Sequence, residues 1–425
     1  MTRPDDPLEW LYGRQRLGMT LGLRRVQLLL AAAGDPQGKF RSILVGGTNG
    51  KGSTARALAE CLRAAGERVG LYGSPHLSRI GERFIVDGQE LARSAVAEAV
   101  AEVRPAAERL EASFFEILTV AGCLLFAERR VSSAVMEVGL GGRFDATNAL
   151  EPDLSLVTGI SLDHVDLLGD NAAAIAREKA GIFRSRRPAM TAAQGEALAV
   201  LRDEAERLGA PLWELGREIE VEGHSLGWQG VRLWVRCPAG EAGGASPLVG
   251  AHQVRNLALA TAAALQRGVS ADAVGRGLAV TRSPGRLERV RHQGRWLLFD
   301  GAHNAEAASA LAGAMGELLD APCTLVVGLG RDKDLAAFSA ALGPHADRVF
   351  ATRALHSPRA RPPEEVAAAF GSGAESVADP RSALAAALEA TAPGETVVVA
   401  GSLYLVGELR PAVVGEEFEA EERWQ

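Results

Sequence analysis

The sequence lacks the features that mark membrane, secreted and nucleic-acid-binding proteins. No apolar run approaches the roughly 18 residues that cross a bilayer, and the acidic N-terminal stretch MTRPDDPLEW has no apolar segment typical of a signal peptide. The formal net charge of -7 argues against nonspecific binding of nucleic acid. We therefore expect a cytoplasmic protein with neither a membrane nor a nucleic acid among its partners.

Cysteine and lysine are both rare. The four cysteines form no C-x-x-C pair, which favours buried free thiols over disulfides or a zinc site. Of the 46 basic residues, only four are lysines: Lys39, Lys51, Lys179 and Lys333. An overall bias toward arginine explains this ratio, but arginine cannot replace a compact amine that loses its proton readily. Each lysine is therefore a candidate for chemistry, except Lys39, which we expect to be solvated in a turn.

Composition and periodicity predict a soluble α/β protein. The chain has 425 residues, of which 47% are hydrophobic and 23% charged, enough for two or three domains with a large core. Strand-like runs alternate with helical patterns, which is typical of a mostly parallel sheet covered by helices on both faces. We expect strands at 43–45, 69–72, 133–138, 154–158 and 188–191, and helices near 92–103, 115–128 and 172–183.

The second half of the chain predicts two further units. Short apolar runs over residues 218–235 indicate a small antiparallel patch. The polar stretch TRSPGR indicates a linker, after which strands at 296–299, 324–327, 348–351 and 396–400 predict a Rossmann-like domain without a G-x-G-x-x-G motif. We expect a P-loop-containing domain over 1–280, a linker over 281–288 and the smaller Rossmann-like domain over 289–425.

The most informative stretch is GGTNGKGST at residues 46–54, between a strand-like run and a helical pattern. In this context, backbone N–H groups and a helix N-terminus bind phosphate. Lys51 would place a charge near the β- and γ-phosphates, and Ser53 or Thr54 would offer a hydroxyl to Mg²⁺. The general P-loop has no residue equivalent to Gly52, and an ordinary glycine-rich turn is the alternative interpretation.

Three residues outside the loop are candidates for a metal centre. Glu137 ends an apolar strand, where its carboxylate either holds Mg²⁺ or simply ends the strand. His164 also follows a strand, but imidazole is an unusual Mg²⁺ ligand, so a turn histidine is the alternative. Lys179 lies in a helical pattern, either paired with a glutamate on the surface or buried with a lowered pKa. A buried amine would react with CO₂, and the resulting carbamate could orient a metal ion.

Polar residues also follow the strands of the second series, where ligands bind in such sheets. Asp300 and His303 follow one strand, Ser402 follows the last, and Asn256 begins a helix. Each of these positions also suits a helix cap. Their functional interpretation depends on the nucleotide that the first domain predicts.

In combination, these motifs resemble the dihydrofolate synthase/folylpolyglutamate synthase family of the Mur ligase superfamily. The resemblance covers nearly the whole chain in order, and the loop of this superfamily carries the glycine found at Gly52. The stretches are GTNGKGST (47–54), SPHL (74–77), SFFE (113–116), EVGLGGRFDATN (137–148), LDH (162–164), EKAGI (178–182), HQ-x-x-N (252–256), PGR (284–286), DGAHN (300–304), DKD (332–334) and GSLYLVG (401–407).

The resemblance implies an ATP-dependent amide ligase that phosphorylates a pteroate or folate carboxylate, so that the amine of L-glutamate can attack the acyl phosphate. It implies catalytic roles for Lys179, which would be carbamylated, and for His303 and Arg286, and Mg²⁺ ligands at Ser53, Glu137 and His164. It implies an ATP site made of Thr48, Asn49, Gly50, Lys51, Gly52, Ser53, Thr54, Asn256, Arg286, Asp300 and His303.

The same resemblance implies where the other substrates bind. The folate would contact Ser113, Phe115 and Asp145. Phe115 would stack on the pterin ring, and Asp145 would accept hydrogen bonds from the amino-pyrimidine edge. Ser402 would contact the glutamate. The expected partners are ATP, L-glutamate and dihydropteroate or tetrahydrofolate polyglutamates, and we expect a monomer.

Two alternatives remain open. A peptidoglycan-type Mur ligase shares the ATP chemistry but needs a region that binds a UDP-sugar. About forty residues precede the phosphate loop, which is short for that region, and SPHL with SFFE favours folate. A nucleotide-binding regulatory protein without turnover is the second alternative, against which the presence of Lys51, Glu137, Lys179 and His303 argues.

Overall fold

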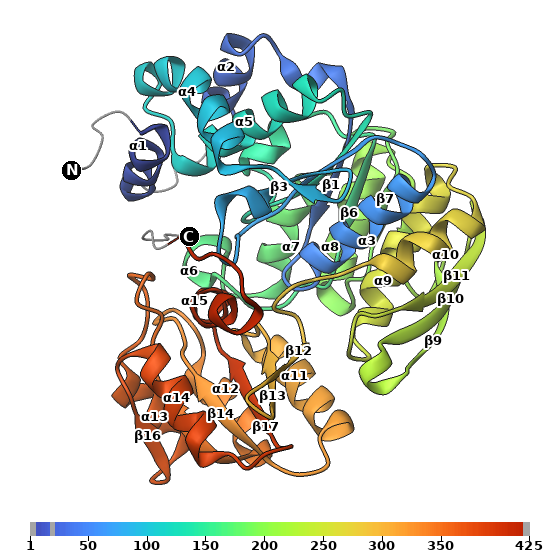
Figure 1. Cartoon of the computed structure of the whole chain (residues 1–425). Coiled ribbons are helices and arrows are strands. Elements are labelled where there is room, and N and C mark those ends of the chain that lie inside the picture. The colour runs from blue at the N-terminus through green and yellow to red at the C-terminus, as the bar shows by residue number, and fades with distance from the viewer. Residues whose placement is uncertain (1–5, 18–21, 420–425) are drawn as a thin grey trace.

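The computed structural model describes residues 6–17 and 22–419, which form an eight-stranded sheet and two further sheets (Figure 1). The order of the large sheet is β4-β3-β2-β5-β1-β6-β7-β8, parallel from β2 onward and antiparallel at the β3–β4 edge. The mostly parallel sheet predicted from the sequence is thus confirmed. Its strands are β1 (Arg41–Gly46), β2 (Val69–Tyr72), β3 (Phe84–Val86), β4 (Gln89–Glu90), β5 (Ser133–Glu137), β6 (Leu154–Val157), β7 (Ala189–Thr191) and β8 (Leu212–Glu214).

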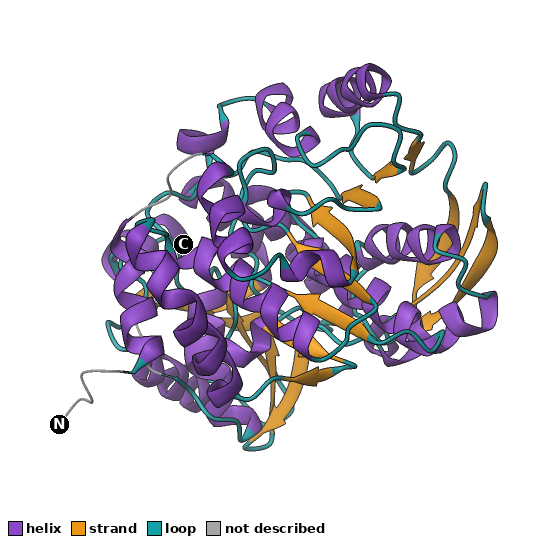
Figure 2. Ribbon diagram, turned by 90° about the horizontal axis from the view of Figure 1, so that it is seen from above, coloured by secondary structure: helices purple, strands orange, loops and turns teal. Residues whose placement is uncertain are grey.

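Helices cover both faces of this sheet because its central strand is apolar on both sides (Figure 2). Ile43 and Val45 belong to one hydrophobic core and Leu44 to the opposite one. The helices of the N-terminal part are α1 (Pro7–Gly13), α2 (Arg24–Ala32), α3 (Lys51–Ala64), α4 (Arg93–Arg109), α5 (Phe114–Glu128), α6 (Val165–Leu168), α7 (Ala172–Ala180), α8 (Gly195–Leu208), α9 (Gln253–Gln266) and α10 (Ala271–Val280).

Two of the predicted helices end elsewhere than expected. Helix α4 continues to Arg109 through Pro105, and it buries Ala106 and Ala107 beyond the proline. Packing of this last part against the core outweighs the local cost of proline. Helix α7 ends at Ala180, before Gly181, rather than at residue 183.

The predicted antiparallel patch is a sheet of order β11-β10-β9, made of β9 (Glu220–Ser225), β10 (Val231–Cys237) and β11 (Gly240–Ser246). Strand β11 was not predicted, because GEAGGAS has no β-branched or aromatic residue. Its glycines instead allow β10 to approach closely, since a Cβ on Gly243 would lie 2.2 Å from the carbonyl oxygen of Leu233 in β10. This strand therefore follows from tertiary packing rather than from local propensity.

The third sheet has the order β12-β13-β17-β14-β15-β16 and is parallel except for β12. It lies below the large sheet in Figure 1 and matches the predicted Rossmann-like unit. The domain limits stay a prediction, and β12 begins at the end of the predicted linker. The elements are β12 (Glu288–His292), β13 (Arg295–Phe299), β14 (Cys323–Val327), β15 (Ala346–Ala351), β16 (Ala374–Ser376), β17 (Thr396–Ala400), α11 (Ala305–Leu318), α12 (Leu335–Leu342), α13 (Pro363–Phe370), α14 (Pro380–Ala390) and α15 (Leu403–Val414).

Membrane crossing requires a long apolar helix. Among the helices of residues 6–17 and 22–419, none combines the necessary length and apolar character.

Candidate active site

The phosphate loop connects β1 to the N-terminus of α3, and its glycines are required by their surroundings. Gly47 and Gly50 have positive φ angles of 138° and 87°. A Cβ on Gly47 would lie 1.8 Å from Thr158 Oγ1, and one on Gly50 would lie 2.2 Å from Asn256 Oδ1. The loop therefore wraps tightly against its neighbours, and its backbone N–H groups at the start of α3 can bind an anion.

Lys51 folds back over this loop. Its Nζ donates hydrogen bonds to the carbonyl oxygens of Gly47 at 3.0 Å and Thr48 at 2.8 Å. Burial lowers the pKa of Lys51, and the nearby Glu137 carboxylate partly opposes this shift. The Lys51 amine is thus held at the loop where phosphate is expected, beside a carboxylate that favours its charged form.

The two hydroxyl candidates of the loop point in different directions. Thr54 Oγ1 donates to the backbone oxygen of Asn256 at 3.2 Å, which ties α3 to α9. Ser53 lines a cavity, and its hydroxyl makes no hydrogen bond to any residue that the structure describes. Ser53 is therefore the better placed metal ligand of the two.

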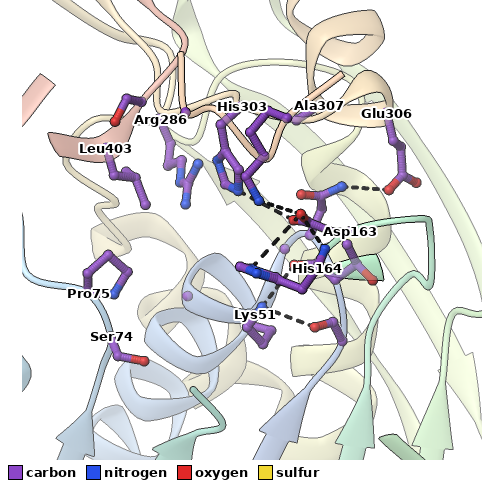
Figure 3. Close-up of a pocket in the computed structure, with 18 of the residues that line it drawn as sticks. Lys51, Ser74, Pro75, Asp163, His164, Arg286, His303, Glu306, Ala307 and Leu403 are labelled. Carbon is purple, nitrogen blue, oxygen red and sulfur yellow. Dashed lines mark hydrogen bonds and ion pairs between the residues drawn. The ribbon is translucent and has the colours of Figure 1, made fainter. Parts of the chain in front are cut away.

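A cavity of about 300 Å³ lies between the large sheet and the third sheet (Figure 3). The predicted residues that line it come from the loop, from neighbouring strand ends and from the C-terminal part of the chain. They are Thr48, Asn49, Gly50, Lys51, Gly52, Ser53, Glu137, His164, Lys179, Asn256, Arg286, Asp300, His303 and Ser402. The fold thus brings most of the predicted nucleotide and metal residues to one place.

Lys179 on α7 is buried, with 4% of its surface exposed. Its Nζ donates to the carbonyl oxygen of Gly47 at 2.7 Å. Burial, followed by the charge of Lys51, lowers the pKa of Lys179 to about 7. The surface ion pair considered from the sequence is therefore wrong, because this amine is buried at the cavity wall, where its lowered pKa lets the neutral form be populated near pH 7.

Glu137 ends β5 beside β1, where Val45 is its register partner. Its Oε2 accepts a hydrogen bond from the N–H of Ser74 at 3.2 Å, and burial raises the pKa of the carboxyl group. Its Oε1 accepts no hydrogen bond within residues 6–17 and 22–419. A buried carboxylate with an unused oxygen at a cavity wall fits a cation ligand.

Asp163 joins the two halves of the site and was not among the predicted site residues. Its carboxylate lies 2.5 Å from Lys333 Nζ and 3.6 Å from His303 Nε2, and it accepts a hydrogen bond from Asn304 Nδ2 at 3.1 Å (Figure 3). Burial alone would raise the pKa of Asp163, but the His303 hydrogen bond and the charges of His164, His303 and Lys333 hold it well below its ordinary value.

His164 is the N-cap residue directly before α6 and has a left-handed backbone, at φ 51°. Its Nε2 lies 3.9 Å from Asp163 Oδ1, and burial lowers the pKa of the imidazole to about 4. The ring is therefore neutral at physiological pH, which is the form that binds metals. Its position in the cavity fits the predicted role as a metal ligand, and it also fits a role as a neighbour that orients Asp163.

Asn49 of the phosphate loop reaches directly to helix α11. Its Nδ2 donates to Asn304 Oδ1 at 3.2 Å and to Glu306 Oε2 at 2.6 Å, and Asn304 Nδ2 donates back to Asn49 Oδ1 at 3.1 Å. The roles of Asn304 and Glu306 here were not predicted. The DGAHN and DKD motifs contained Asn304 and Lys333, and the rarity of lysine was a usable signal for Lys333.

The remaining cavity residues differ in what their side chains do. Asp300 accepts hydrogen bonds from the N–H groups of Leu287 at 2.9 Å and Ala302 at 2.8 Å, so its carboxylate holds the linker against β13. Ser402 caps α15, where its Oγ accepts from the N–H of Tyr404 at 3.1 Å. Arg286, by contrast, makes no side-chain hydrogen bond or ion pair with the described residues.

The three predicted folate residues lie outside this cavity. Ser113 caps α5 together with Glu116, and the Phe115 ring lies against Gly139, whose Cβ would be 2.5 Å from it. The Asp145 carboxylate already accepts hydrogen bonds from Gly139 N, Leu140 N, Thr147 N and Thr147 Oγ1. Asp145 thus organises the loop after β5, and a pterin contact would have to share these acceptor oxygens.

Two of the folate residues, Phe115 and Asp145, nevertheless adjoin the cavity through the loop that follows Glu137. Gly139 and Leu140 line the cavity, their N–H groups donate to the Asp145 carboxylate, and the Phe115 ring lies against Gly139. Their roles stay a prediction, as do those of the nucleotide and metal residues.

Comparison with known proteins agrees with this geometry. The Mur ligase middle domain matches residues 45–264, and the Mur ligase glutamate ligase domain matches residues 285–403. Folylpolyglutamate synthase of Lacticaseibacillus casei is 35% identical over 96% of this chain and 98% of that protein. The structure of Escherichia coli FolC in complex with DHPP and ADP has a TM-score of 0.87 and 34% identity, over 97% of this chain and 98% of that chain.

A further solved relative is a bifunctional folylpolyglutamate synthase/dihydrofolate synthase with Mn, AMPPNP and L-glutamate bound. Its TM-score is 0.85 and its identity 31%, over 97% of this chain and 98% of that chain. The family resemblance expected from the motifs is confirmed. This chain belongs to the folylpolyglutamate synthase/dihydrofolate synthase branch of the Mur ligase family.

Proposed function

We propose that this protein is an ATP-dependent ligase that joins L-glutamate to dihydropteroate, to folate glutamates, or to both. The observation that carries the proposal is the meeting of Lys51, Glu137 and Lys179 with Arg286 and His303 in one cavity, in a chain of this family. A carboxylate oxygen of the acceptor attacks the γ-phosphorus of ATP and releases ADP. The amine nitrogen of glutamate then attacks the carbonyl carbon, and phosphate leaves from the tetrahedral intermediate.

The phosphate loop holds the nucleotide in this scheme. Backbone N–H groups at the start of α3 and the Lys51 ammonium group bind the phosphates, and Arg286 and His303 approach from the other side of the cavity. Enclosure between two sheets excludes water from an acyl phosphate, which hydrolyses readily. The hydrogen bond between Asn49 and Asn304 and the ion pair between Asp163 and Lys333 hold the two sides of the cavity together.

Ser53, Glu137 and His164 would hold Mg²⁺. No three His, Cys, Asp or Glu side chains in the described parts of the chain form a metal site by themselves, which fits an ion that takes most of its ligands from phosphate and water. When bound, the ion neutralises charge on the transferred phosphoryl group. The free Oε1 of Glu137 and the free hydroxyl of Ser53 support this assignment.

Lys179 is the residue we propose to be carbamylated. Its neutral amine adds to the carbon of CO₂ and loses a proton, which leaves an anionic carbamate. The pKa of about 7 supplies the neutral amine, and the N–H that remains after carbamylation can still donate to the carbonyl oxygen of Gly47. The carbamate then offers an oxygen ligand where the free lysine offers a positive charge.

The acceptor would lie along the loop after β5, with its pterin ring against Phe115 and near Ser113 and Asp145. The glutamate would approach from the α15 side, near Ser402. A peptidoglycan-type ligase is disfavoured because relatives that match nearly the whole chain are named for folate substrates. The proposed enzyme would act with ATP, L-glutamate and a divalent cation.

Acceptor-dependent phosphate release tests the proposal. The protein is incubated with ATP, Mg²⁺ and glutamate, and with dihydropteroate, tetrahydrofolate or a UDP-muramyl peptide. We expect release that requires a pterin acceptor. Release that requires the muramyl peptide would establish the rival ligase, and release without any acceptor would contradict both.

A further inference from the structure

A second cavity of about 150 Å³ adjoins the central one and has no role in the scheme above. Ser74, Pro75, Glu137, Arg286 and Leu403 line both cavities. Figure 3 shows Arg286 and Leu403 on one side, and Ser74 and Pro75 on the other. The second cavity therefore opens onto the place where the acceptor and the nucleotide would meet.

Four arginines line this second cavity, and two of them are fully paired. Arg79 lies 2.9 Å from Glu90 and 2.8 Å from Glu416. Arg410 lies 2.6 Å from Glu288 and 2.8 Å from Glu416. The Arg79–Glu416 pair ties the chain after α15 to the N-terminal part, and Arg410 links α15 to β12 through Glu288. These ion pairs account for the charges of Arg79 and Arg410.

Arg56 and Arg286 are different. Arg56 lies on α3, just over one turn beyond Gly52, and Arg286 lies in the linker. Neither guanidinium group makes a hydrogen bond or an ion pair with any part of the chain that the structure describes. Burial lowers the pKa of Arg56, and among the nearby charges Arg286 lowers it further while Glu137 and Glu82 oppose the shift.

The carboxylates Glu82 and Glu137 favour the charged form of Arg56 from a distance, but within the described residues neither pairs directly with Arg56 or with the Arg286 side chain. Glu82 accepts hydrogen bonds from the N–H groups of Leu77, Ser78 and Arg79, at 2.7, 3.1 and 3.0 Å. Glu137 faces the phosphate loop and is the proposed metal ligand. Two guanidinium groups with spare donors, close enough to repel each other at one cavity, are the arrangement that a bound anion would stabilise.

We propose that Arg56 and Arg286 bind a carboxylate of a glutamyl group, an inference that rests on the proposed function. The nucleotide phosphates have the loop and Lys51; Arg286 lies between the two cavities and faces both, whereas Arg56 lines the second cavity and not the central one. The remaining anions of the reaction are the carboxylates of the incoming glutamate and of a glutamyl residue already on the folate. Both have the planar geometry that a guanidinium group binds with two hydrogen bonds.

The Arg56→Gln variant tests this assignment and separates the two sources. If the site holds the incoming amino acid, the KM for glutamate rises roughly 10- to 100-fold with either acceptor. If it holds the folate tail, the KM for tetrahydrofolate rises by that factor while the KM for dihydropteroate is unchanged. The KM for ATP stays within about twofold in both cases. Unchanged KM values for glutamate and both acceptors, or an increase for ATP alone, would overturn the proposal.

Two controls separate binding from folding. Arg63→Gln lies on the same helix, where Arg63 is exposed and paired with Glu60 at 2.6 Å, and it should leave every KM unchanged. Arg56→Lys keeps the positive charge but loses the planar group that donates two parallel hydrogen bonds to a carboxylate. The affected KM should therefore lie between that of the wild type and that of Arg56→Gln. Because Arg56 has no protein partner, Arg56→Gln should not lower the melting temperature; a lower melting temperature with unchanged KM values would assign a structural role and overturn the proposal. A wild-type protein without pterin-dependent phosphate release would instead contradict the proposed function.

Discussion

Lys333 Nζ lies 2.5 Å from Asp163 Oδ1, and this ion pair joins the loop after β14 to the loop after β6. Both side chains are about 10% exposed, so the pair is shielded from solvent. His303 and Asn304 approach the other oxygen of the same carboxylate. One acidic residue therefore connects the large sheet to the third sheet at the wall of the cavity.

Removing Lys333 should weaken the connection between the two sides of the site. We expect Lys333→Met to lower kcat/KM at least roughly tenfold, because a buried carboxylate loses the lysine with which it forms an ion pair. Steady-state kinetics measure the effect. Lys39→Met is the matched control, since Lys39 is an exposed lysine before β1. Equal kinetics for wild type and Lys333→Met would show that this ion pair does not matter for turnover.

Lys179→Ala should abolish turnover while ATP still binds, because the proposed carbamate cannot form. ATP binding is measured by calorimetry and turnover by phosphate release. A small carboxylic acid added to the variant should restore part of the activity by taking the place of the carbamate. Wild-type turnover in this variant would refute the assigned role.

The lowered pKa of Lys179 also predicts how stability depends on pH. Between pH 7 and about 10.5 the unfolded chain binds the extra proton and the folded chain does not, so this group makes the folded state more stable as pH rises. Below pH 7 the folded state bears the whole cost of the buried charge, about 5 kcal/mol by the linkage relation.

Lys179→Met removes this cost. In buffer free of CO₂, the variant should melt at a higher temperature than the wild type at pH 7, and the difference should shrink toward pH 10. Differential scanning calorimetry across this range measures the effect. A difference that does not change with pH would mean that Lys179 titrates normally.

Glu137→Gln should raise the Mg²⁺ concentration for half-maximal activity at least roughly tenfold. The amide keeps the volume of the side chain but removes the charge that favours a cation. Glu128→Gln on the exposed part of α5 serves as the control. An unchanged Mg²⁺ requirement would remove Glu137 from the metal site.

Phe115→Ala should raise the KM for pteroate acceptors roughly tenfold and leave the KM for ATP unchanged, because the stacking surface is lost. The ATP value is the internal control, since Phe115 lies outside the cavity of the phosphate loop. Equal increases for both substrates would remove the stacking role.

Local motifs predicted the parts of the site that follow one another along the chain. The phosphate loop, Glu137 at the end of its strand and the rare Lys179 were all accessible in this way, as was the mostly parallel sheet. Asp163 was not, because its partners Asn304 and Lys333 lie 141 and 170 residues further along the chain. Asp145, by contrast, was predicted as a folate contact from its motif. In the structure its carboxylate accepts hydrogen bonds from N–H groups of its own loop, which a motif match cannot reveal.

The proposed reaction depends on an acyl-phosphate intermediate, and an isotope label shows whether this intermediate forms. The acceptor is prepared with heavy oxygen in its free carboxylate, and the released phosphate is analysed by mass spectrometry after turnover with ATP and glutamate. We expect one heavy oxygen from each extended acceptor to appear in the released phosphate. Phosphate without the label, alongside an extended acceptor, would contradict it.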